Sequence, residues 1–196
     1  MKSLTHYIQE KLVIKKNKYN YFPKTKEELR NIIEQRVKNE GNEVDLNDID
    51  VSNVTDMSHL FEGIDFNGDI SQWNVSNVKD MSYMFWGCSQ FNSDISEWDV
   101  SNVTNMQNMF AWCPKFNQDI TDWDVSNVTD MSGMFWKCSE FNQDISNWNV
   151  SKVTNMRDMF AWCENFNQDI SNWDVSNVTN RMDIFYNCML KRKYRP

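Results

Sequence analysis

The chain repeats one stretch, Trp98 to Asp122, at a fixed spacing of 25 residues. The period is marked by a tryptophan at Trp73, Trp98, Trp123, Trp148 and Trp173, and by a cysteine at Cys88, Cys113, Cys138, Cys163 and Cys188. A self-similar period of about 20 to 50 residues is typical of proteins whose units bury their apolar faces by stacking on their neighbours. We therefore predict one domain: an N-terminal segment over 1–43, a six-unit repeat solenoid over 44–188 and a basic tail over 189–196.

The apolar residues within a unit predict its secondary structure. Val103, Met106, Met109, Phe110 and Cys113 have the spacing of one helical face, which predicts a short helix over VTNMQNMFAW. The stretch 116–123 contains an isolated apolar residue between polar ones and predicts a strand of three or four residues. We expect an α/β repeat protein of strand–helix units. An all-β parallel helix is the alternative, and the apolar spacing disfavours it because it does not alternate.

The segment before the repeats predicts a capping helix. Thr25 with Glu28 forms a capping-box pattern, and Gly41 supplies a left-handed stop. Apolar residues between them fall on one face, at Leu29, Ile32, Ile33 and Val37. We expect this helix to cover the apolar end of the first unit. A second, shorter helix is predicted around Leu4, Ile8, Leu12 and Val13.

Charge is distributed unevenly along the chain. Residues 1–47 hold ten Lys and Arg against seven Asp and Glu, residues 48–190 hold six against 21, and residues 191–196 hold four and none. Phosphate binding needs a basic patch, so the acidic repeat body argues against nucleic acid and anionic membrane as partners. No apolar run is long enough for a signal peptide or a membrane span, which predicts a cytoplasmic protein without membrane insertion.

The five cysteines have an odd number and the spacing of the repeat itself, which favours one small, buried and reduced side chain per unit over a disulfide framework. Redox or metal chemistry along a row of thiols is the alternative. Without a Cys-x-x-Cys pair, and with only two histidines, the sequence does not support zinc.

Stacking turns each repeated residue into a row. One acidic row is Asp69, Asp94, Asp119, Asp144 and Asp169, which Asp45 precedes. An asparagine row is Asn67, Asn92, Asn117, Asn142 and Asn167. Carboxylates stacked at about 5 Å repel one another, so we expect each aspartate to accept turn N–H groups and each asparagine to bond to the next coil. Calcium binding is the alternative, which the scarcity of glycine disfavours. No metal or other cofactor is predicted.

Two further sets of residues are candidates for a binding surface. The first is an aromatic row beside the cysteines, whose place alternates between neighbouring units: Trp86, Trp112, Trp136, Trp162 and Tyr186. Packing between neighbouring units explains the row, and so does a stripe of exposed rings, the residue type enriched at interfaces and sugar platforms. The second set varies from unit to unit, so contacts between units do not fix its residue types: Gln72, Glu97, Asp122, Asn147 and Asn172. Ser82, Tyr83, Gln107, Asn108, Arg157 and Asp158 vary in the same way.

The last unit departs from the pattern. Arg181 stands where methionine is expected, and nothing like FNQDI follows Cys188. We therefore expect the stack to end here, with its last face covered by Met189, Leu190 and Tyr194 or by another chain.

The string DVSNVTDMSGMFWKCSEFNQDISNW, from Asp124 to Trp148, resembles the 25-residue repeat of the BspA-like and mycoplasma-type surface-protein family, which is grouped with leucine-rich repeats. The lead-in PKTKEEL and GNEVDLNDIDVSNVTDM is also similar, so the resemblance covers residues 23–188. It implies a right-handed strand–helix solenoid and, for the better-known members, surface exposure and binding of host proteins. It implies no catalytic residues.

No nucleophile–base pair, phosphate loop or metal cluster stands out along the chain, so we expect a protein that is not an enzyme. The predicted function is protein binding or adhesion through an extended acidic face. One alternative is a carbohydrate-binding module that uses the tryptophan, aspartate and asparagine rows. Another is an assembly component that self-associates through its open C-terminal coil.

Overall fold

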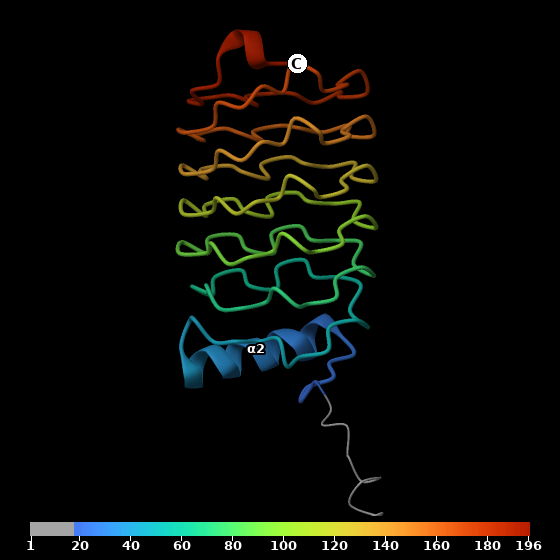
Figure 1. Cartoon of the computed structure of the whole chain (residues 1–196), viewed down its shortest axis with the longest axis vertical. Helices are drawn as coiled ribbons and strands as arrows, with labels where there is room; N and C mark the ends of the chain where they lie inside the picture. The colour runs from blue at the N-terminus through green and yellow to red at the C-terminus, as the bar shows by residue number, and fades with distance from the viewer. Residues whose placement is uncertain (1–17) are drawn as a thin grey trace, which may run out of the picture.

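The computed structural model describes residues 18–196, so the helix predicted around Leu4, Ile8, Leu12 and Val13 lies outside the described residues. Helix α2 (Lys26–Glu40) is followed by a column of stacked coils and, near the C-terminus, by one 3-10 turn, η1 (Arg192–Tyr194). Figure 1 shows the coils stacked along the long axis, with α2 beneath the first and η1 beyond the last. Within 18–196, no helix is both long and apolar enough to cross a membrane.

The prediction of a leucine-rich-repeat-like solenoid of α/β strand–helix units is wrong. Among the described residues the units contain no helix and no strand; neighbouring coils are joined by isolated parallel bridges such as Asp80 with Asn105 and Asn105 with Asp130. The stretch predicted as helix consists mainly of turns and one bridge residue, and the stretch predicted as strand is irregular apart from a turn at residues 121–122. The repeat units are therefore irregular coils whose order comes from stacking.

The apolar spacing misled the helix prediction because a series of tight turns has a similar period. The backbone N–H groups of Met109, Cys113 and Phe116 donate to carbonyls three residues earlier, those of Met106, Phe110 and Cys113. Apolar residues three apart therefore point to the same side, as they nearly do in a helix. Two left-handed residues in this unit, Asn108 at φ 51° and Trp112 at φ 61°, prevent a continuous right-handed helix.

Hydrogen bonds to the next coil occupy the amides that a helix would use. Between two middle coils, the amides of Met106, Asn108, Phe110 and Trp112 donate to the carbonyls of residues 130, 132, 134 and 136 at 2.8–3.0 Å. Because these bonds alternate with the local turn bonds, nearly every buried backbone group in this stretch has a partner. The same four-bond pattern recurs at each of the five junctions between coils.

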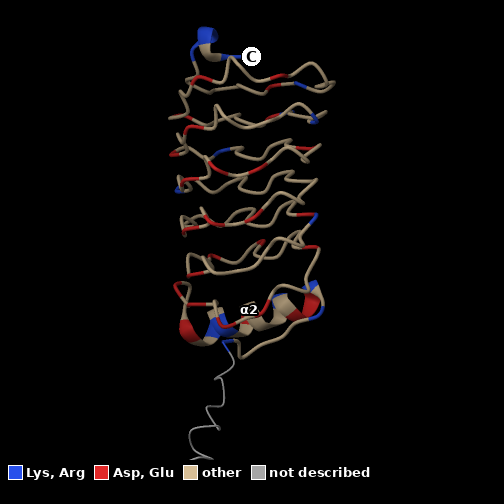
Figure 2. Cartoon of the chain, turned by 45° about the vertical axis from the view of Figure 1, so that its right-hand side comes forward, with Lys and Arg blue, Asp and Glu red and all other residues tan. Residues whose placement is uncertain are grey.

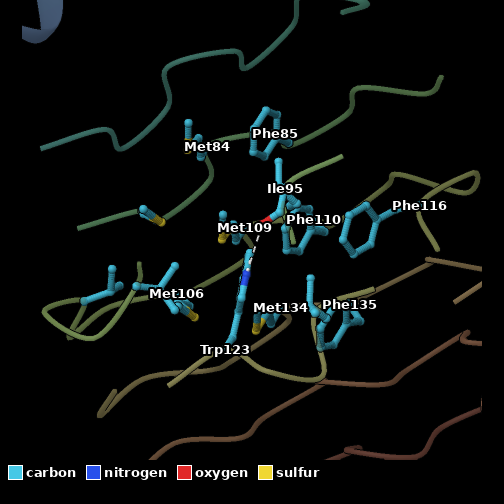
Figure 3. Close-up of a cluster of buried hydrophobic side chains, with 14 of the residues drawn as sticks. Met84, Phe85, Ile95, Met106, Met109, Phe110, Phe116, Trp123, Met134 and Phe135 are labelled. Atoms are coloured by element: carbon cyan, nitrogen blue, oxygen red, sulfur yellow. Dashed lines mark hydrogen bonds between the residues drawn. The ribbon is translucent and has the colours of Figure 1, made fainter. Parts of the chain in front are cut away.

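The core is a set of parallel aromatic rows that run along the stack. The ring centroids of Phe85 and Phe110 lie 5.7 Å apart and those of Phe110 and Phe135 lie 5.9 Å apart, with nearly parallel planes. Each repeated tryptophan is also buried and spans two coils, as in the bond from Trp123 Nε1 to the Ile95 carbonyl oxygen at 3.1 Å (Figure 3). Stacked buried rings and indole hydrogen bonds between coils thus stabilise the stack.

Helix α2 begins and ends as predicted. The Thr25 side chain accepts the Glu28 N–H, the Glu28 carboxylate accepts the Lys24 N–H, and Gly41 ends the helix at φ 96°. Leu29 and Ile33 are fully buried in the same core as the repeats. The helix therefore packs on the first coil through the apolar face that the sequence indicates.

Candidate functional site

The aromatic row lies on the surface. Tyr186 is 55% exposed, Trp112 is 43% exposed and Trp162 is 39% exposed, whereas Trp86 and Trp136 are half-buried. Neighbouring rings meet edge to face, with centroids 5.7 Å apart for Trp112 and Trp136 and 5.8 Å apart for Trp162 and Tyr186. The row thus combines the two features that the sequence suggested: its rings pack between coils, and three of them are exposed.

The alternation of the row follows from one left-handed position before each cysteine. In two units tryptophan itself takes this position, at Trp112 with φ 61° and Trp162 with φ 62°. In the other units Gly87, Lys137 or Asn187 takes it, and the aromatic residue stands one residue earlier. Ala111, which replaces that earlier indole, is fully buried, so the small and large side chains complement each other between coils.

One cation lies among three of these indoles. The Lys137 ammonium is 3.4 Å from the ring centroid of Trp112, 5.7 Å from that of Trp136 and 5.9 Å from that of Trp162. An ammonium over an indole face is attracted by the ring quadrupole. Lys137 therefore ties three consecutive coils together at the surface and occupies one face of Trp112.

The acidic row and the first variable set lie together on a different edge. All the residues of both sets are exposed: Asp69, Asp94, Asp119, Asp144, Asp169, Gln72, Glu97, Asp122, Asn147 and Asn172. Glu97, Asp99, Asp119 and Asp122 line one hollow of about 360 Å³, and no basic residue lines it. Figure 2 shows acidic residues along the coils and the basic C-terminal turn. We call the surface formed by the acidic row and the first variable set the acidic edge.

Each aspartate of the acidic row closes a turn, as predicted. The Asp69 carboxylate accepts the Ser71 N–H at 2.9 Å and the Asp119 carboxylate accepts the Thr121 N–H at 3.0 Å. These backbone hydrogen bonds lower the pKa of Asp69 and of Asp119. Hydrogen bonds from Ser146 and Ser171 lower the pKa of Asp144 and Asp169 in the same way, because they favour the charged form.

The asparagine row bonds from coil to coil, also as predicted. The backbone N–H of Asn117 donates to the side-chain oxygen of Asn92 at 2.8 Å, and that of Asn142 donates to the side-chain oxygen of Asn117 at 2.9 Å. At the end of the row, the buried side-chain oxygen of Asn167 has no partner among residues 18–196. The row holds the coils in register.

Four of the five cysteines are structural, which confirms the favoured interpretation for these four. Cys88, Cys113, Cys138 and Cys163 are fully buried and free of disulfides. Each thiol lies 2.8–3.3 Å from a backbone carbonyl oxygen of the preceding coil. Burial raises the pKa of the Cys88 thiol to about 12 and raises the others as well, so thiolate chemistry is suppressed.

The structure does not bring the aromatic row and the acidic edge into one hollow. Trp136 lines a separate hollow with five variable or small positions and one serine: Gln107, Asn108, Ser132, Gly133, Arg157 and Asp158. Within the described part of the chain, no group of three His, Cys, Asp or Glu side chains is arranged to hold a metal ion. The two surfaces are thus separate candidates for contact with a partner.

A third feature was only partly apparent from the sequence. An apolar groove of about 290 Å³ lies at the C-terminal end of the stack, lined mainly by Met156, Phe160, Trp173, Val175, Val178, Ile184 and Phe185. Leu190 is buried and η1 docks through the bond from the Ile170 amide to the Tyr194 carbonyl oxygen at 3.1 Å. The tail therefore covers only part of the last coil, and Met189, expected to help, is 71% exposed.

The family comparison agrees with the repeat. The family described as Mycoplasma protein of unknown function, DUF285, matches residues 28–128 and 113–193. The chain belongs to this family. Membership in DUF285 is consistent with the mycoplasma-type tandem repeat that the sequence resembles. Searches of curated proteins and of solved structures found no match.

Proposed function

We propose that this DUF285 protein is a noncatalytic protein-binding module and that the aromatic row is the anchor of its interface. The observation that carries the proposal is the pair Trp112 and Trp162, bulky residues that are exposed and held at positive φ. Backbone of this kind costs about 1–3 kcal/mol at each residue, and such strain gathers at functional sites. The left-handed backbone itself belongs to the repeated turn, since Gly87, Lys137 and Asn187 take it in the other units. Core packing does not account for a bulky ring at this position, because the side chains remain 43% and 39% exposed.

Two contacts favour a polypeptide over a sugar as the ligand. Lys137 covers one face of Trp112, and the Trp112 and Trp136 rings meet edge to face, whereas a sugar platform needs open, flat ring faces. Exposed indoles beside adaptable polar residues are typical of protein interfaces. The acidic edge adds a long-range attraction for a basic partner, which speeds encounter rather than holding the complex.

The test compares three forms of the chain as baits in affinity capture from cell extracts with quantitative mass spectrometry. The double variant Trp112→Ala/Trp162→Ala removes both strained anchors. The matched control Phe22→Ala removes an aromatic side chain that is 51% exposed but lies outside the row. We expect proteins retained by the wild type and the control to fall about tenfold or more on the double variant, as removal of interface hot spots does.

Circular dichroism and urea unfolding establish that the double variant is folded before capture. Equal capture by all three forms would contradict the proposal. A glycan array probed with the same three forms addresses the carbohydrate alternative, which saturable binding to a glycan, lost on the double variant alone, would support instead.

A further inference from the structure

The stack has a direction, because four backbone donors at every junction point toward the C-terminus, while fewer, such as the Thr104 amide to the Lys79 carbonyl, point back. At the last junction the amides of Met156, Asp158, Phe160 and Trp162 donate to carbonyls of the final coil at 2.7–2.9 Å. The acceptors belong to Asn180, Met182, Ile184 and Tyr186. Four such bonds form at each junction, so every inner coil satisfies its donors with the carbonyls of its successor.

The final coil repeats the donors without a successor. By the 25-residue period, the equivalent amides are those of Arg181, Asp183, Phe185 and Asn187. Within residues 18–196 these four amides have no hydrogen-bond partner, although the amides of Met182, Tyr186 and Cys188 between and after them do. The final coil therefore presents donors at two-residue spacing, as the edge of a sheet does.

The donor row borders the apolar groove described above. Three residues of the row, Arg181, Asp183 and Phe185, line the groove. Tyr186 and Met182 beside them are 55% and 59% exposed. An extended polypeptide that paired its carbonyls with the row would place alternate side chains toward this groove. Hydrogen bonding and burial of apolar surface thus act on the same segment.

The charges around the groove are mainly positive. Arg181 and Arg195 line it, with Asp183 as the one acidic side chain among the lining residues. Arg195 donates to the Leu190 carbonyl at 2.9 Å and its guanidinium lies 4.8 Å from the Phe185 ring centroid. The adjacent tail adds Lys191, Arg192 and Lys193. A ligand with carboxylates is therefore favoured over a neutral or basic one.

Three candidates from the chain itself fit poorly. The first coil of a second copy has carbonyls of the required kind, but Arg30 occupies those of Leu60 and Glu62 at 3.3 and 3.0 Å. Two C-terminal ends placed face to face would oppose donors to donors and cations to cations. Residues 1–17 carry four lysines against one glutamate and would repel the basic rim.

We propose that the final coil docks an extended, acidic segment of a partner polypeptide. Carbonyls of the segment accept the four amides of the donor row, an apolar side chain enters the groove, and carboxylates face Arg181 and the basic tail. Tyr186 belongs to both surfaces, but the anchors Trp112 and Trp162 do not line the groove, so each of the two proposals can fail without the other.

The probe is a synthetic peptide of alternating valine and glutamate, blocked at both ends and about seven residues long, which spans four donors at two-residue spacing. The matched control replaces glutamate with lysine. Calorimetric titration measures affinity, and NMR-detected amide exchange measures the hydrogen bonds. We expect saturable binding of the acidic peptide and at least about tenfold slower exchange at Arg181, Asp183, Phe185 and Asn187 in its presence.

Charge reversal of the rim sharpens the test. Arg181→Glu/Lys193→Glu should weaken binding by about tenfold or more, whereas Lys79→Glu/Arg157→Glu, which changes two basic residues on the side of the stack, should change it less than about twofold. Trp112→Ala/Trp162→Ala should also leave peptide affinity unchanged. The amide readout on the wild type needs no variant, so it stands even if a charge reversal unfolds the tail.

Several results would overturn the proposal. One is the absence of saturable binding up to about 1 mM peptide. Equal affinity for the lysine peptide would contradict recognition of carboxylates by the basic rim. Binding without slower exchange at the four amides would contradict pairing with the donor row. A dimer in light scattering with these amides already protected in the free chain would assign the end to a second copy.

Discussion

The two ends of the stack have opposite chemistry and are closed to different degrees. At the N-terminal end, α2 buries Leu29 and Ile33, and its Arg30 donates to carbonyls of the first coil. Its Lys26 bonds to the Asp56 carboxylate and the Ser58 hydroxyl, each at 2.8 Å. At the C-terminal end a short basic tail leaves four donors and an apolar groove uncovered by the described residues.

The difference follows from the direction of the backbone hydrogen bonds. Because each coil donates toward the C-terminus, the first coil has spare acceptors and the last coil has spare donors. Cationic side chains from a helix satisfy acceptors, and α2 supplies them. The cationic side chains of the tail cannot satisfy donors, so the C-terminal end is suited to carbonyls and carboxylates from elsewhere.

The thiols provide the most sensitive comparison of the ends. Cys88 is fully buried near the closed end, whereas Cys188 at the open end is partly exposed. The Cys188 thiol makes only a long contact, 3.8 Å, to the Phe166 carbonyl oxygen. Burial raises the pKa of both thiols, to about 12 for Cys88. We expect Cys188 to react with an aromatic disulfide reagent about 1,000-fold faster, because Cys88 must await local unfolding.

The measurement is the rate of reagent release from the native chain at neutral pH. One of the five thiols should react quickly, and Cys188→Ser should abolish that phase. Fast reaction of Cys88 in the Cys188→Ser variant would show that the closed end opens as readily as the other.

Matched leucines compare the packing of the two ends. Leu29→Ala should lower the free energy of unfolding by about 3 kcal/mol, because it leaves a cavity between α2 and the first coil. Leu190→Ala should cost about 1 kcal/mol, since the tail can detach while the coils remain stacked. Urea unfolding followed by tryptophan fluorescence measures both, and equal losses would mean that the tail closes its end as firmly as α2.

Matched arginines compare the hydrogen bonds at the two ends. Arg30→Met keeps much of the apolar stem but leaves carbonyls of the first coil without their donor, so we expect a loss of about 2 kcal/mol. Arg181→Met, on the exposed rim, should change stability by less than about 0.5 kcal/mol. A loss for Arg181→Met as large as that for Arg30→Met, in the same urea assay, would show that the last coil depends on its rim charge.

The acidic edge spans the stack and should respond to acid similarly toward both ends. Hydrogen bonds lower the pKa of Asp69 near the closed end and of Asp169 near the open end. A folded-state pKa below the unfolded value stabilises the fold above about pH 4, and this contribution is lost as pH falls through the folded pKa.

We therefore expect the urea midpoint to fall as pH drops below about 4, and Asp69→Asn and Asp169→Asn each to make that fall slightly less steep. The amide oxygen still accepts the turn N–H but does not titrate. If neither variant changes how steeply the urea midpoint falls with pH, the acidic row is excluded as a source of the acid response. If only one variant changes it, the two ends of the stack differ in their response to acid.

Several features of the fold were predictable because they depend on local chemistry. The Thr25 cap and the Gly41 stop need only their own segment. The buried positions follow from repeated apolar residues. The turn-closing role of Asp119 follows from its short side chain, whose carboxylate can reach the backbone N–H two residues later, that of Thr121. The exposure of Trp112 was one of two interpretations that the sequence allowed, whereas its position at positive φ could not be predicted, since an indole is rarely left-handed.

The repeat period, the capping helix, the buried rows and the uneven charge are all properties of the amino-acid sequence alone. Whether residues three apart form a helix or a series of turns depended on the next coil, whose carbonyls take the amides of residues such as Asn108 and Phe110. The same contacts set the direction of the stack, and so decided that α2 meets acceptors while the last coil presents donors. These are long-range backbone pairings, and a local sequence pattern does not encode which partner an amide finds.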